Sequence, residues 1–491
     1  MSEARDPKGP DEAVCRRSTG SACQRTTRRE FMIAGGAAAV SLGALGLVRS
    51  AWGEEPKSLL APTSQPLKKC SLRVEWVGKE AAAVEAASLT KALDTTALKL
   101  GVGLDYGQPA AGPPDGVLIV ALNGKKDEAM AEAAKGGATP AVVLCPREQG
   151  PASGAVWQLA ESKAGLLLGT SKDEKDVVYG LRMLHAAWKV KGNARIFRLS
   201  FHSPAYAAAQ QQVREDKAAQ EEAEAFADYY MKEAEEIRRA KWMDLVYAGL
   251  VYVCMRRIMT ANKYDGIGLS DCLQSYRAMG TNPCVPAMRL LDEGLPAACE
   301  GDMSGLDVQL LTHWLFGRPS YIAEGQPTLR NTRINAHCTS PSKLNGYDQP
   351  HEPFDLMSHS ETGRGVAPDV KWKIGQDVTV FRARTKLGTG HIVSNTLFPP
   401  NGGCHTSIEY TIDGMADVGR AGTGLGSPHS MVVYGNVERE MDAFWTLVQG
   451  KLPYTKYRDV PAPAQPRTES PSEGTNCPSC PCCRWAHCPR G

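Results

Sequence analysis

Two glutamates and a histidine stand at points in the chain where a strand should end. Glu300 follows an apolar pair in the run Ala297-Ala298-Cys299-Glu300-Gly301-Asp302, and Glu324 follows another apolar run. His337 ends an alternating segment shortly afterwards. Carboxylate oxygens and imidazole nitrogens are ligands that divalent cations accept in proteins. Because ligands bind beyond the carboxyl ends of strands in open α/β sheets, this placement predicts a metal centre.

The segments around these residues resemble the L-fucose and L-arabinose isomerase superfamily. The order of short motifs carries the resemblance: Asp265–Cys272, Asn282–Pro286, Leu291–Gly294, the Cys-Glu-Gly-Asp turn, and the closing segment Pro428–Asn436. It spans roughly residues 215–450. The interval from Glu300 to Glu324 also fits the superfamily, in which a second acid follows the first about two dozen residues later.

The resemblance implies an activity and a set of ligands. Glu300 and Glu324 would hold a divalent ion, most simply Mn2+, and would act as the catalytic acid/base pair. His337 and His429 would complete the metal site. The reaction would be aldose-ketose isomerisation of a free monosaccharide, by ene-diol proton transfer between C1 and C2. Such a metal ion stabilises charge on the two oxygens, and paired carboxylates move the proton. The resemblance also implies a trimer or hexamer.

Several of these assignments have alternatives in the sequence. Glu300 could instead be an acidic residue that complements the start of a helix, and Asp302 is the expected cap of that helix. His337 could be a buried structural histidine. His405 competes with His429 as the last metal ligand. Sugar hydroxyls are the predicted partners of His359, Glu361 and His405, and the alternative for the first two is that they face solvent.

The N-terminus has the form of an export signal. Arg28-Arg29 precedes a short run of Ala, Gly and Leu, and Ala51-Trp52-Gly53 offers a cleavage site. We expect residues 1–53 to be a twin-arginine signal peptide recognised by the twin-arginine translocase, which would place the mature chain in the periplasm or elsewhere outside a bacterial cytoplasm. The alternative, a membrane anchor, is disfavoured because the run is short of the roughly 20 apolar residues that a span needs.

Composition argues against nucleic acid as a partner, and the cysteines fall into two sets, one in the body of the chain and one in the tail. The 491-residue chain has a formal charge of +2 with acids and bases interspersed, so it lacks the basic stripe of a nucleic-acid-binding protein. Cysteines scattered singly through the body are expected to pack as small hydrophobes. The tail could bind zinc, form disulfides or stay unstructured; its cysteines are Cys477, Cys480, Cys482, Cys483 and Cys488.

Hydrophobic periodicity predicts two α/β units and a β unit. After a linker over residues 54–69, strands and helices alternate through residues 70–203, which favours a doubly wound, flavodoxin- or Rossmann-like domain. Strands at Ser71–Val77, Asp115–Leu122 and Ala141–Leu144 alternate with helices at Ala81–Leu100, Lys126–Lys135 and Glu174–Val190, and Ala194–Phe201 closes the unit.

A second doubly wound domain, residues 204–327, is expected to carry the metal carboxylates, with Pro319–Ala323 as the strand that delivers Glu324. Short alternating runs then predict an antiparallel, barrel-like domain over residues 328–455. Residues 456–491, rich in Pro and Cys, should be a disordered tail.

Three functions are compatible with this pattern. The first is the metal-dependent isomerase. The second is an exported carbohydrate- or metal-binding protein that keeps the scaffold without turnover, because sugar isomerisation usually feeds a cytoplasmic kinase. The third is a metal-assisted hydrolase or epimerase.

Overall fold

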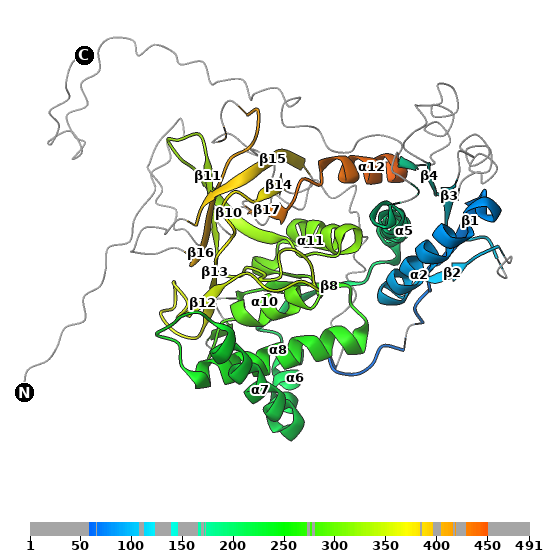
Figure 1. Cartoon of the computed structure of the whole chain (residues 1–491). Helices are drawn as coiled ribbons and strands as arrows, with labels where there is room; N and C mark the ends of the chain where they lie inside the picture. Colours follow the sequence, from blue (N-terminus) through cyan, green and yellow to red (C-terminus); the bar gives the residue numbers. More distant parts are fainter. Residues whose placement is uncertain are drawn as a thin grey trace, which may run out of the picture.

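A computed structural model describes residues 58–449, apart from several short stretches. Three regions are visible in Figure 1: a parallel sheet with its helices, a helical layer beside a second parallel sheet, and a β-barrel. The predicted signal peptide, the tail, and the predicted helix Lys126–Lys135 lie outside the described residues. The internal stretches not described are residues 65, 108–111, 123–138, 146–164, 168–170, 172, 273–274, 277–279, 383–384, 396–403, 416–417 and 419–428.

The first region is a five-stranded parallel sheet. Its order is β2-β1-β3-β4-β5. The apolar strands β3 and β4 are buried along their whole length, as parallel strands covered on both faces are. Helix α5 packs on them, and its first turn is capped by Asp173, which accepts from the backbone N–H of Lys175. The elements are β1 (Ser71–Val77), α2 (Ala83–Leu100), β2 (Gly103–Asp105), β3 (Gly116–Ala121), β4 (Ala141–Leu144), β5 (Gly165–Leu167) and α5 (Glu174–Trp188).

The second region is a smaller parallel sheet of three strands, β6-β8-β9, with helices around it. The sequence assigns β6 (Ile196–Ser200) to the first unit, but this strand pairs with β8 (Gly266–Ser270), so the assignment to the first sheet is wrong. The remaining elements are α6 (Pro204–Glu215), α7 (Lys217–Glu233), α8 (Trp242–Asn262), α10 (Cys284–Asp292), β9 (Ala297–Ala298) and α11 (Met303–Phe316).

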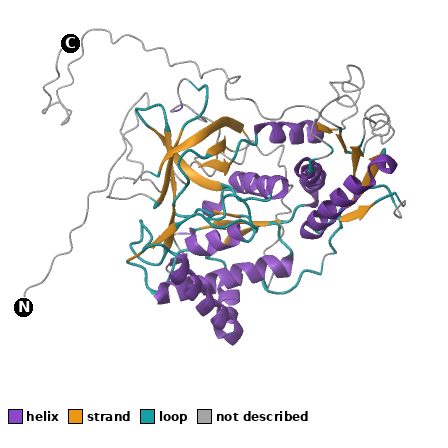
Figure 2. Ribbon diagram, in the orientation of Figure 1, coloured by secondary structure: helices purple, strands orange, loops and turns teal. Residues whose placement is uncertain are grey.

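The third region is a closed antiparallel barrel of six strands, β10-β11-β16-β15-β14-β17 (Figure 2). The sequence predicts the antiparallel character, but it places the strand before Glu324 in the parallel sheet. That placement is wrong: β10 pairs antiparallel with β11 and β17. The strands are β10 (Tyr321–Pro327), β11 (Arg333–His337), β14 (Asp377–Arg382), β15 (Thr385–Ser394), β16 (Thr406–Tyr410) and β17 (His429–Tyr434).

Two hydrophobic cores join the three regions. One runs from α7 and α8 through the second sheet into the barrel, and the other joins the first sheet, α5, α11 and the barrel. Smaller elements complete the fold: the sheet β13-β12-β7 (Ala367–Val370, Phe354–Met357 and Ile237–Arg238) and the final helix α12 (Glu438–Gln449). A search of the described helices for one long and apolar enough to cross a membrane finds none.

Candidate metal centre

Glu300 lies in a tight turn at the carboxyl end of β9. The strand is only two residues long, and the chain then makes a single 3-10 turn over Cys299–Gly301. Glu300 has a φ of 57°, in the left-handed region that residues other than glycine seldom adopt. Asp271, which follows the neighbouring strand β8, has a φ of 59°. Backbone strain of this kind gathers at binding and catalytic sites, so the turn is a candidate for function.

Glycine is required immediately after Glu300. Gly301 also has a positive φ, of 65°, and a Cβ placed there would lie 2.9 Å from the hydroxyl oxygen of Ser270. The turn after β9 is therefore packed directly against the end of β8. Two successive left-handed residues reverse the chain between the strand and the start of α11.

Two barrel histidines flank the Glu300 carboxylate. His337 ends β11 and His429 begins β17, and both are almost fully buried. The Nε2 atom of His429 lies 3.4 Å from Oε2 of Glu300, and that of His337 lies 3.7 Å from Oε1. The two rings are 5.6 Å apart between centroids. The Glu300 side chain keeps 30% of its surface exposed, so the cluster opens to solvent on the side of this carboxylate.

The spacing of these atoms fits a cation better than direct hydrogen bonds. Ligand atoms about 2.1 Å from one ion, at roughly 90–110° to each other, lie roughly 3.0–3.4 Å apart. The measured separations of 3.4 and 3.7 Å are close to this range and longer than an ordinary hydrogen bond. The Nε2 atom of His337 is buried and has no hydrogen-bond partner among the described residues. One carboxylate and two imidazoles are an accepted ligand set for Mn2+, Fe2+ or Zn2+.

Asp302 orients His429. One oxygen, Oδ1, accepts from the backbone N–H groups of Ser304 and Gly305, so Asp302 caps α11 as predicted. The other, Oδ2, accepts from Nδ1 of His429 at 3.0 Å. This hydrogen bond assigns the proton of a neutral His429 ring to Nδ1 and turns the lone pair of Nε2 toward Glu300. A carboxylate behind a histidine is the usual support for a metal ligand.

The hydrogen bonds of His337 favour metal binding less than those of His429 do. Its Nδ1 accepts a 3.3 Å hydrogen bond from the backbone N–H of Thr339, which favours a proton on Nε2. To bind a cation through Nε2, the ring must move that proton to Nδ1, where the sulfur of Cys338 lies 3.8 Å away. A cation at this position therefore competes with a proton.

The three side chains shift each other's pKa values. Burial would raise the pKa of Glu300, but His337 and His429 outweigh it and hold this pKa well below its usual range. Burial would lower the pKa of both histidines; Glu300 raises that of His337 to about 10, and Asp302 with Glu300 raises that of His429 to about 9. A negative carboxylate flanked by protonated imidazoles follows from this balance, and the second proton of His337, on Nδ1, would replace the hydrogen bond that this atom accepts from Thr339. Because a metal ligand must be a neutral imidazole, ion binding would release protons.

The structure does not bring Glu324 into this group. Glu324 lies inside β10 and is exposed. It is opposite His429 in the β10–β17 ladder, which places it on the barrel wall beside the cluster. Within the described part of the chain, the side chains whose ligand atoms converge here are Glu300, His337 and His429.

The other predicted site residues lie elsewhere. His405 donates from Nε2 to the backbone carbonyl of Ser358 at 2.7 Å, so of the two competing histidines it is His429 that lies beside Glu300. His359 is 2% exposed rather than facing solvent, and it lies against Cys284 and Cys338. Glu361 is exposed.

Sequence reasoning missed a cluster of thiols next to Glu300. The buried cysteines Cys272, Cys284, Cys299 and Cys338 meet here, with Cys404 at their edge, and all are free. The signal was adjacency, because Cys299 precedes Glu300 and Cys338 follows His337.

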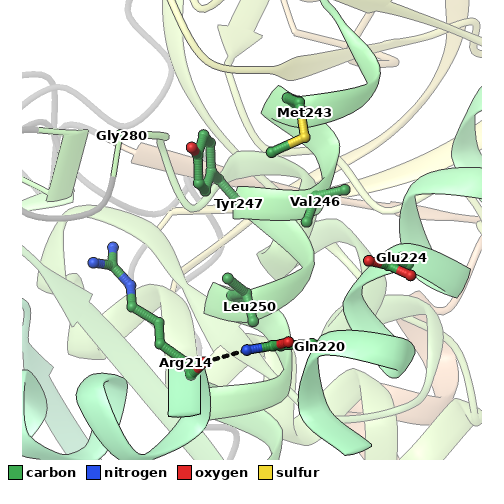
Figure 3. A pocket seen from close by; sticks show the side chains of 8 residues that line it. All are labelled: Arg214, Gln220, Glu224, Met243, Val246, Tyr247, Leu250 and Gly280. Atoms are coloured by element: carbon green, nitrogen blue, oxygen red, sulfur yellow. Dashed lines mark hydrogen bonds between the residues drawn. The ribbon is translucent and has the colours of Figure 1, made fainter. Parts of the chain in front are cut away.

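A separate pocket of about 560 Å³ lies among α6, α7 and α8 (Figure 3). Partly exposed apolar side chains line it, among them Met243 and Tyr247. None of the candidate metal ligands belongs to its lining.

Comparison of the sequence with models of known protein families, and with curated proteins, finds no match.

Proposed function

We propose that this protein is a metal-dependent aldose-ketose isomerase of the L-fucose/L-arabinose isomerase type. The observation that supports this most is the convergence of Glu300, His337 and His429 from three separate segments onto a space of cation size. Their order along the chain is the order that the resemblance implies. The reaction would be proton transfer between C1 and C2 of a free monosaccharide.

In this proposal, metal binding and proton transfer are carried out by different residues. Glu300, His337 and His429 would hold the ion, with Asp302 fixing the orientation of His429. The ion, most simply Mn2+, would supply Lewis-acid stabilisation of the charge that develops on the two sugar oxygens. Because the pKa of Glu300 is held low, its carboxylate suits a permanent ligand better than a group that gains and loses a proton. A catalytic base needs a pKa nearer the working pH.

Glu324 is the candidate for the proton-transfer role. It is exposed on the barrel wall, opposite His429 in the strand ladder, where a sugar bound at the cluster could reach it. The carbon-bound proton would pass from C2 or C1 to this carboxylate and then to the neighbouring carbon, while the hydroxyl proton moves from one of the two sugar oxygens to the other. Of the residues predicted to bind sugar hydroxyls, the exposed Glu361 remains the candidate for the substrate side of the site.

A second candidate function is a carbohydrate- or metal-binding protein without turnover. The observation that favours it is the position of Glu324 outside the convergent group, because a single carboxylate at the ion leaves the acid/base pair incomplete. An exported protein that captures a sugar or a metal ion needs only the ligands.

Metal content and turnover, measured together, separate the two functions. We expect the purified protein to hold Mn2+ or another divalent ion by elemental mass spectrometry, and Glu300→Gln to lose it. An aldose screen of pentoses and 6-deoxyhexoses should then give ketose product with wild type only. A sugar-dependent rise in melting temperature without ketose would support the binding protein instead. Full activity in Glu300→Gln would contradict both the ligand and the mechanism.

Export and assembly are part of the same proposal. The protein would carry a twin-arginine signal over residues 1–53 and would act in the periplasm or another extracytoplasmic space. Two doubly wound domains would precede the barrel, with β6 in the second of them and β10 in the barrel, and the chain would assemble as a trimer or hexamer. Light scattering on the purified protein measures the last of these directly.

A further inference from the structure

The thiol cluster beside Glu300 is assembled from distant parts of the chain. Cys284 begins α10, Cys299 follows β9, and Cys338 follows β11. His359 comes from the loop after β12, and Cys404 precedes β16. Five segments therefore deliver a sulfur or an imidazole to one place.

Cys338 is at the centre of this cluster. Its sulfur lies within 4.8 Å of those of Cys284 and Cys299, and Cys404 packs against the same group. The ligand atoms of Cys284, Cys338 and His359 all lie within 4.8 Å of one another, and all three residues are buried. Sulfur atoms that share one tetrahedral ion at about 2.3 Å are roughly 3.8 Å apart, so ligand atoms within 4.8 Å of one another would close by at most about 1 Å to bind one ion.

The cluster differs in chemistry from the neighbouring carboxylate group. Thiolates select soft ions, whereas carboxylates suit Mg2+, Ca2+ and Mn2+. Two pairs of adjacent residues separate the two kinds of ligand: Cys299 precedes Glu300, and Cys338 follows His337. The cysteine of each pair belongs to the thiol cluster and Glu300 to the carboxylate group, whereas His337 lies within reach of both, because its ring also converges with Cys299 and Cys338.

We propose that Cys284, Cys338 and His359 form a second metal site for a thiophilic closed-shell ion, with Cys299 or Cys404 as the fourth ligand. Zn2+ is the first ion to test, because a closed tetrahedral set of cysteines and histidine is typical of structural zinc. The site joins α10 and the loop after β12 to the end of β11; with Cys299 as the fourth ligand it also joins the end of β9, and the ion would then stabilise the turn that carries Glu300. This proposal does not depend on isomerase activity.

The experiment needs a background without the cysteines of the tail, which could bind zinc themselves. The full chain is prepared under reducing conditions with serine in place of these five residues, and is titrated with Co2+ as a spectroscopic substitute for zinc. The background positions are Cys477, Cys480, Cys482, Cys483 and Cys488.

We expect a thiolate-to-cobalt charge-transfer band that Zn2+ abolishes. Cys284→Ser should weaken Zn2+ binding by more than about 100-fold, since even an outer-shell partner of a metal site is worth roughly 10–100-fold in affinity. Cys254→Ser is the matched control, because Cys254 is buried in α8 within a core of apolar side chains. This control should bind Zn2+ with the same affinity as the background protein. Glu300→Gln should keep the cobalt band.

Each outcome decides the proposal. If the reduced background protein shows no charge-transfer band, the proposal is wrong. This outcome does not depend on Cys284→Ser, so misfolding of that variant does not affect it. Unchanged zinc affinity in Cys284→Ser would also overturn it. A titration with Cu+ in parallel identifies the ion: retention of Cu+ in preference to Zn2+, lost in Cys284→Ser, supports the site and assigns it to copper. Disulfides among these cysteines in the freshly purified protein, with no metal bound, would contradict it.

Discussion

The turn after β9 and the strand β10 each carry a glutamate that the sequence marks as a metal ligand, but only one of them meets other ligands. Glu300 sits in a left-handed turn between two buried histidines. Glu324 sits within a regular antiparallel strand, exposed on the barrel wall. Both follow apolar runs of similar appearance. The difference shows that a carboxylate at an apparent strand end is informative only when the sheet to which the strand belongs is known.

The physical cause is the direction of the strands. In a parallel sheet the carboxyl ends of strands share one edge, so a residue after β9 lies beside the residue after β8. In the barrel, neighbouring strands run in opposite directions, and the same rule does not apply to β10. Ligands reach Glu300 from the barrel through the end of β11 and the start of β17, which lie on either side of Glu324 in the middle of β10.

The largest expected effect separates these two glutamates. Glu300→Gln should weaken Mn2+ binding by at least about 100-fold, because a direct ligand and its negative charge are lost. Glu324→Gln should change Mn2+ affinity by less than about 3-fold, since its side chain lies outside the convergent group. Calorimetric titration with Mn2+ measures both constants. Equal losses in the two variants would mean that Glu324 binds the ion and that the contrast between the two regions is wrong.

Local patterns in the sequence predict where strands and helices lie better than they predict which strands pair with each other. The predicted bounds of β1 and β4 match the observed ones, and Asp302 caps α11 as expected, because apolar periodicity and helix caps are local signals. The pairing of β6 with β8 was not predicted, because it depends on contacts between residues about 70 positions apart.

The same limit applies to the site. The sequence indicates Glu300 and His337 singly through their neighbours, but it treats the cysteines as core residues. They are indeed buried, yet their gathering around Cys338 depends on loops from five segments. No spacing motif connects Cys284 with Cys404 in the chain. Such a cluster can be recognised only once the topology is known.

An intermediate effect on Mn2+ affinity is expected at Asp302, which accepts a hydrogen bond from the candidate metal ligand His429 on the side of the ring away from Glu300. Asp302→Asn should weaken Mn2+ binding by roughly 10–100-fold, because the charged partner of His429 Nδ1 is lost. Asparagine is as good a helix cap as aspartate, so α11 should keep its first turn. Asp173→Asn makes the same change at the cap of α5 and should leave metal affinity unaltered. Equal affinity in Asp302→Asn and wild type would show that His429 is not oriented by this hydrogen bond.

Opposite pH dependences are expected for the metal-free and the metal-loaded protein. His337 and His429 have pKa values of about 10 and 9, above the ordinary value near 6.5 of the unfolded chain. Their contribution to the stability of the metal-free protein is complete below about pH 6.5 and is lost as the pH rises through about 9–10. The melting temperature of the metal-free protein should therefore fall over this interval through these groups.

The metal-loaded protein should show the reverse trend in the stabilisation that the ion adds. Protons compete with the ion for both imidazoles, so the rise in melting temperature caused by Mn2+ should grow from pH 6.5 toward pH 9. Glu300 contributes in the other direction in the metal-free protein: its lowered pKa means that its stabilisation is lost only in acid. A metal-induced rise that is constant with pH would contradict coordination by the two histidines.

The smallest effect on metal affinity is expected from a change that damages the helical layer and leaves the ligands in place. A Cβ at Gly249 in α8 would lie 2.7 Å from the backbone of Ala223 in α7, so Gly249→Ala should force the two helices apart and cost about 1–3 kcal/mol of stability. Gly112→Ala meets no atom within 4 Å and should stay within about 0.5 kcal/mol of wild type. Urea unfolding compares the two, and Mn2+ titration should give the wild-type affinity for both. If Gly249→Ala instead weakened Mn2+ binding as much as Asp302→Asn does, affinity would depend on the stability of the whole fold, and not on the carboxylate behind His429.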